Sequence, residues 1–132
     1  MQNHLIITGI IFILLALIHM IFPKYFEWKK EFGSLSLANR QIMEIHTIFI
    51  AITVFLMGIL CLTSADDLIE TRLGKKIILG FAVFWTIRLI FQFFGYSSKL
   101  WKGKFFETSV HIIFSIIWIY ISFVFWAIYF DI

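Results

Sequence analysis

The chain has 132 residues, of which 61% are hydrophobic and 14% charged, and its formal net charge is +3. A water-soluble domain of this length cannot bury that much apolar surface, so the composition excludes an ordinary soluble globular protein. The single cysteine, Cys61, excludes an intramolecular disulfide.

Four apolar runs are each long enough to cross about 30 Å of hydrocarbon as a helix. They cover residues 5–22, 45–65, 77–98 and 108–130. A lone strand would leave backbone groups unpaired in lipid, and the runs lack the alternation of barrel strands. We therefore predict an all-α integral membrane protein: one domain, residues 1–132, folded as an antiparallel bundle of four transmembrane helices.

We expect the first apolar run, residues 5–22, to be a retained helix and not a signal peptide that is removed. No basic residue precedes it and no small-residue cleavage site follows it. Pro23, the only proline, marks the expected end of this helix. Residues 24–32 then mix aromatic rings with lysines, which is typical of the headgroup region, so we expect a short interfacial segment there.

Basic residues are unevenly distributed among the three loops. The first and third loops carry Lys24, Lys29, Lys30, Arg40, Lys99, Lys102 and Lys104, whereas the second carries Arg72, Lys75 and Lys76. The positive-inside rule then puts loops one and three in the cytoplasm. We expect a multi-pass protein of the bacterial inner-membrane type with both termini outside.

Polar side chains gather in the cytoplasmic half of the predicted spans. Arg88 and Gln92 lie four residues apart in the third span, on the same face as Trp85. His111 and Ser115 share a face of the fourth span in the same way. A charge in a span costs free energy unless it faces the bundle interior, so these faces are expected to meet in a cytoplasm-side polar pocket.

This pocket predicts a binding or accessory role with a lipid-soluble or anionic ligand, such as a quinone. The candidate ligand-binding residues are Arg88, Gln92, His46, His111, Trp85 and Ser115. The alternative for Arg88 is a purely structural hydrogen-bond donor. No pattern identifies a catalytic residue, and whether the protein is an enzyme stays open.

Three histidines at similar depth on three spans suggest a second function. His19, His46 and His111 could hold a divalent metal or supply axial ligands to haem b, as in a membrane redox protein. The chain lacks the HxxxH, ExxH and CxxC spacings that would strengthen this interpretation.

The lipid bilayer is the main expected partner. Aromatic residues interleaved with lysines could also indicate nucleic-acid binding, but the flanking spans make the membrane the better interpretation, and no nucleic acid is expected. A proton or solute pathway through one four-helix unit would need a homo-oligomer or other membrane subunits.

Overall fold

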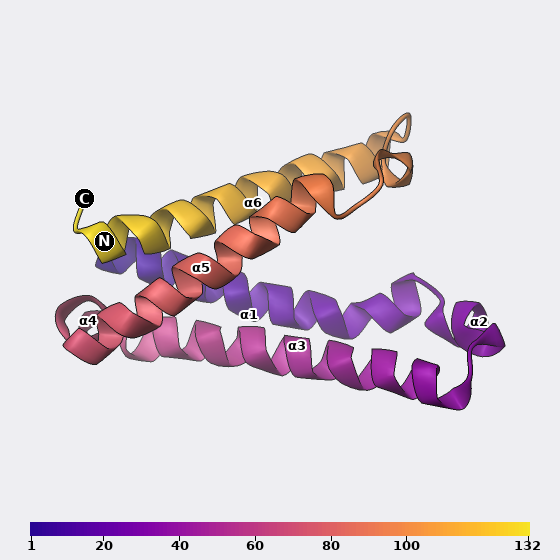
Figure 1. Ribbon diagram of the computed structural model, residues 1–132, viewed down its shortest axis with the longest axis horizontal. Helices are drawn as coiled ribbons and strands as arrows, with labels where there is room; N and C mark the ends of the chain where they lie inside the picture. Colours follow the sequence, from indigo (N-terminus) through magenta and orange to yellow (C-terminus); the bar gives the residue numbers. More distant parts are fainter. The chain divides into compact units, whose positions relative to one another are not determined.

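The computed structural model describes residues 1–132 and contains helices but no strands (Figure 1). The elements in chain order are α1 (Gln2–Tyr25), α2 (Trp28–Glu31), the 3-10 turn η1 (Phe32–Ser34), α3 (Leu37–Thr63), α4 (Ala65–Glu70), α5 (Arg72–Phe94), the 3-10 turn η2 (Ser98–Leu100) and α6 (Phe105–Phe130). Of these, α1, α3, α5 and α6 are long and apolar enough to cross a membrane. The prediction of an all-helical chain with four such helices is confirmed.

The four long helices begin earlier than the apolar runs, and polar side chains cap two of them. The side chain of Ser36 accepts a hydrogen bond from the backbone N–H of Asn39 and caps α3, which starts eight residues before the apolar run at residue 45. Thr71 caps α5 in the same way through the N–H of Gly74. Hydropathy marks the apolar part of a helix, whereas the cap marks its start.

Pro23 does not end the first helix, contrary to our expectation. Helix α1 continues to Tyr25, because proline removes only its own backbone donor. The backbone N–H of Phe26, three residues after Pro23, still donates to the carbonyl of Phe22 at 2.9 Å. The predicted interfacial segment, residues 24–32, therefore divides into the last turn of α1 and the four-residue helix α2.

The chain divides into two compact units. The first unit, Asn3–Ala65, contains the antiparallel pair α1 and α3. These helices approach closely at two glycines: a Cβ added to Gly58 would lie 2.9 Å from the carbonyl oxygen of Gly9. Small residues permit this backbone-to-backbone approach, as they do at many helix contacts in membranes.

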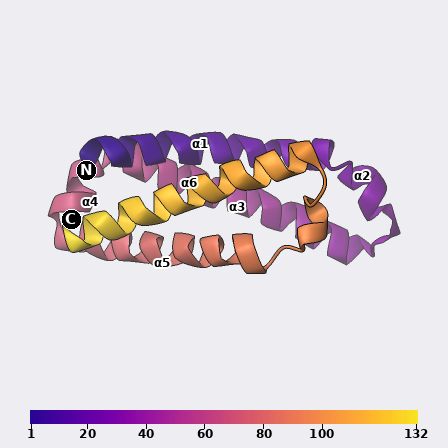
Figure 2. The ribbon, with the colours of Figure 1, turned by 90° about the horizontal axis from the view of Figure 1, so that it is seen from above.

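The second unit contains the antiparallel hairpin of α5 and α6, which Figure 2 shows side by side. Contacts run along the whole hairpin. At its open end Lys75 forms an ion pair with Asp131, and in the middle the indole N–H of Trp126 donates to the hydroxyl of Thr86 at 2.9 Å. The polar cluster described below joins the helices near the η2 end. The hairpin is thus held by polar contacts at three levels.

Candidate functional site

Gln92 is the centre of a polar cluster within the α5–α6 hairpin. Its side chain is only 5% exposed, and it contacts one residue on its own helix and two on α6. Its Oε1 accepts hydrogen bonds from Arg88 at 3.2 Å and from the indole Nε1 of Trp118 at 3.3 Å. Its Nε2 lies 3.1 Å from Nδ1 of His111. One buried amide therefore connects a cation, an indole and an imidazole.

The donors around Gln92 fix the orientation of its amide. Arg88 and Trp118 can only donate, so the atom that both contact must be the amide oxygen. The opposite atom is then the nitrogen, which donates to Nδ1 of His111 and weakly to the His111 carbonyl at 3.4 Å. Nδ1 therefore accepts this hydrogen bond without a proton of its own, and the ring N–H of His111 is on Nε2.

Arg88 has no carboxylate partner. The chain contains one ion pair, Lys75 with Asp131, at the other end of the hairpin. The Arg88 guanidinium is held instead by the Gln92 carbonyl and by two ring faces, with its central carbon 5.0 Å from the Trp118 ring centroid and 5.6 Å from that of Tyr96. Its charge is solvated by dipoles and rings, and it is not neutralised.

An open cavity of about 320 Å³ adjoins this guanidinium. Its lining residues are Arg88, Phe91, Gly95 and Tyr96. Arg88 is the only charged group in the lining, and it lies six residues, or about 9 Å, before the end of α5. The cavity offers one cation, a phenol and apolar surface, which together suit a ligand with a negative group and an apolar body.

Stacked aromatic rings enclose the cluster. Trp85 on α5 stacks against Trp118 on α6, with ring centroids 5.1 Å apart and planes 17° from parallel. Trp101 stacks on His111 at 4.7 Å and 14°. Ser115 donates its hydroxyl to the carbonyl of His111, so it contacts the backbone of the cluster. The rings reduce the access of water to the amide at the centre, which strengthens its hydrogen bonds.

The chain matches no protein-family model, no curated protein and no solved structure. The chemistry of the cluster must therefore carry any proposal about function.

The structure brings five of the six candidate ligand-binding residues into one contact network. They are Arg88, Gln92, His111, Trp85 and Ser115. The sixth, His46, lies on α3 in the other unit, and its side chain is exposed. No contact in the structure supports a role for His46, and its place in the site stays a prediction.

The predicted metal or haem ligands gain no support from geometry. No group of three or more His, Cys, Asp or Glu side chains could hold a metal ion. Nδ1 of His19 donates to the carbonyl of Leu15 at 2.7 Å, which leaves only Nε2 for another role. While Gln92 donates to Nδ1 of His111, neither nitrogen of that ring presents a lone pair to a metal. His19, His46 and His111 belong to both units, and their joint role stays a prediction.

Two residues of the cluster were not among the candidates. Trp118 lies seven residues after His111 and so shares its helix face, and this spacing is enough to predict that it belongs to the cluster. Trp101 lies in the loop before α6, where the hydroxyl of Thr108 donates to its carbonyl at 2.5 Å and helps to hold it over the hairpin. Nothing in the sequence distinguishes Trp101 from the other aromatic residues of the loops.

Proposed function

We propose that this chain is a small multi-pass membrane protein that binds an anionic, lipid-soluble ligand at Arg88. One observation carries the proposal: a guanidinium lines a cavity of about 320 Å³ and has no carboxylate to neutralise it. Ionisable groups within apolar helices are costly and commonly serve function. A ligand carboxylate or phosphate would supply the missing negative charge and pair with the planar donor fork.

The lining of the cavity supports a ligand with two chemical parts. Tyr96 lies beside Arg88, two residues after the end of α5, where the phenol can donate to the same negative group. Phe91 continues the lining along the apolar helix and suits an acyl or isoprenoid chain. The cluster around Gln92 preorganises the guanidinium, because Arg88 is already oriented by a hydrogen bond and two rings.

The basic loop beside the cavity supports a cytoplasmic location for it. The segment from residue 95 to residue 104 contains Lys99, Lys102 and Lys104 and no acidic residue. The positive-inside rule then gives a cytoplasm-side site, both termini outside, and a bacterial inner-membrane type of location. The four long helices would complete one antiparallel bundle in the bilayer.

Thermal stability of the detergent-purified protein tests the proposed ligand class. Oleate and farnesyl phosphate serve as anionic probes, and a decyl-substituted quinone serves as a neutral one. Ligand at a hundredfold excess over its Kd stabilises the folded state by about 2.7 kcal/mol, so the midpoint should rise for the anionic probes. Stabilisation by the quinone and by neither anionic probe would contradict the proposal of an anionic ligand and indicate a neutral one.

Three variants connect this response to the cavity. Arg88→Leu should keep the fold, since an apolar side chain needs no partner, and should lose the response to anions. Arg88→Lys should keep part of it, because lysine retains the charge without the fork. Gln92→Glu should also weaken it, because a carboxylate 3.2 Å from the guanidinium would compete with the ligand.

Arg40→Leu is the matched control for this series. It makes the same substitution on α3, in the other unit, and should leave the response unchanged. If wild type and Arg88→Leu respond equally to every probe, Arg88 has only a structural role.

A further inference from the structure

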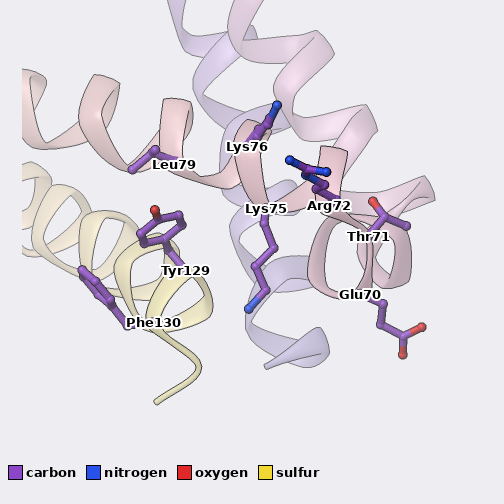
Figure 3. Close-up of a pocket in the computed structure, with 8 residues that line it drawn as sticks. All are labelled: Glu70, Thr71, Arg72, Lys75, Lys76, Leu79, Tyr129 and Phe130. Carbon is purple, nitrogen blue, oxygen red and sulfur yellow. The ribbon is translucent and has the colours of Figure 1, made fainter.

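The opposite end of the α5–α6 hairpin carries a second, larger cavity of about 810 Å³ (Figure 3). Its lining residues are Glu70, Thr71, Arg72, Lys75, Lys76, Leu79, Tyr129 and Phe130. All of them belong to the unit Asp66–Ile132. The cavity therefore lies within one compact unit, far along α5 from the Arg88 site.

The residues that α5 contributes form one stripe with a gradient of polarity. Arg72, Lys75, Lys76 and Leu79 are spaced at i, i+3, i+4 and i+7, so they share one face of the helix. The first turns present three cations, and the next turn presents an apolar side chain. Tyr129 and Phe130 of α6 add aromatic surface beside Leu79 (Figure 3). A charged entrance that leads onto apolar surface at a helix end matches the two parts of a membrane lipid.

The three cations of this cavity differ in whether they have an ion-pair partner. The ammonium of Lys75 is 2.5 Å from a carboxylate oxygen of Asp131, which neutralises it. No ion pair and no hydrogen bond engages the side chain of Arg72 or Lys76, one helical turn apart. In Figure 3 the carboxylate of Glu70 points away from both. Two adjacent cations are thus available to one ligand.

We infer that Arg72 and Lys76 bind the phosphate of a phospholipid headgroup, with the acyl chains lying along Leu79 and Phe130. A guanidinium and an ammonium on successive turns can donate to different oxygens of one phosphate. Asp131 acts as an internal competitor, because it occupies the third cation. This site is separate from the one proposed at Arg88 and does not depend on it.

Lipid titration of the detergent-purified full chain tests the inference, with phosphatidylglycerol as the probe and thermal stability as the readout. The double variant Arg72→Gln, Lys76→Gln should weaken apparent lipid affinity by about tenfold. The matched control is Lys29→Gln, Lys30→Gln, which removes the same charge from α2 in the other unit. It should change the affinity by less than about twofold, as expected for screened, nonspecific attraction.

A variant that is expected to bind lipid more tightly controls for the possibility that the double variant loses affinity because it misfolds. Asp131→Asn should tighten lipid binding by about twofold or more, because it releases Lys75 for the phosphate. Asparagine tolerates the left-handed backbone at residue 131, where φ is 57°. Repeating the titrations in the Arg88→Leu background removes the anion site proposed at Arg88, so the weakening by Arg72→Gln, Lys76→Gln that persists there reports on this cavity alone and separates failure here from failure of the proposed Arg88 function.

Two results would overturn the headgroup site. Equal weakening by both double variants would reduce the effect to surface charge. Protection by inorganic phosphate at the same concentration as the lipid would make the cavity a site for free phosphate, with no part played by acyl chains.

Discussion

Nε2 of Gln92 lies 3.1 Å from Nδ1 of His111, and this contact joins α5 to α6 near the η2 end of the hairpin. The same amide accepts from Arg88 and Trp118 through its oxygen. Gln92 is the residue that hydrogen-bonds to all three of these partners. The amide is therefore the residue on which the hairpin's polar cluster depends most.

Replacing Gln92 with leucine should destabilise the protein by about 1–3 kcal/mol, because buried donors and an acceptor lose their partner. Denaturant unfolding of the purified protein measures this change. Gln41→Leu is the matched control, since Gln41 on α3 is exposed, and it should cost little. Equal costs for the two variants would mean that the cluster contributes no stability.

The tautomer of His111 gives a spectroscopic prediction. Nitrogen NMR of histidine-labelled protein should show the ring N–H of His111 on Nε2, because Nδ1 accepts from Gln92. Gln92→Leu should remove this preference. A proton found on Nδ1 of the wild-type ring would contradict the amide orientation deduced from Arg88 and Trp118.

The contact between α1 and α3 predicts opposite effects for two glycine substitutions. Gly58→Ala should destabilise by about 1–3 kcal/mol, because the new methyl group would lie 2.9 Å from the Gly9 carbonyl oxygen. Gly80→Ala on α5 meets no atom within 4 Å and should be neutral or stabilise by up to about 1 kcal/mol. Unfolding curves of both variants check the pair, and a harmless Gly58→Ala would mean that the two helices can separate freely.

The charge distribution of the loops predicts the topology. Reporter fusions to the C-terminus, after Asp131, should be active only on the outer side of the membrane. Fusions within the loop at Lys102 should be active only in the cytoplasm. The reverse pattern would refute the proposed orientation while leaving the helical fold intact.

The sequence is enough to predict the four long helices and the contact of Arg88 with Gln92 within α5. The i, i+4 spacing of Arg88 and Gln92 is enough to expect their contact, because both lie on one rigid helix. The contact of Gln92 with His111 depends on the rotation and register of two helices, which periodicity leaves undetermined. The helices start outside the apolar runs for a different reason, since hydropathy is insensitive to caps such as Ser36.

His46 lies on an exposed face of α3, outside the set of residues that this helix buries. Helix α3 buries the small or compact residues Thr47, Ala51, Val54, Gly58 and Cys61, which recur at helical spacing. The polar residue His46 lies on a different face of the same helix. Helix pairing in apolar surroundings depends on close packing of small side chains, and polarity alone is a poor guide to the packed face.

The hydrogen bond from Arg88 to Gln92 has a consequence for biosynthesis. Because the two residues are one turn apart, Arg88 gains its first partner as soon as α5 forms, before α6 has been translated. The indole of Trp118 and the ring of His111 arrive later with α6. We therefore expect α5 to enter the bilayer poorly alone and well once α6 emerges, and glycosylation mapping of truncated nascent chains should detect that delay.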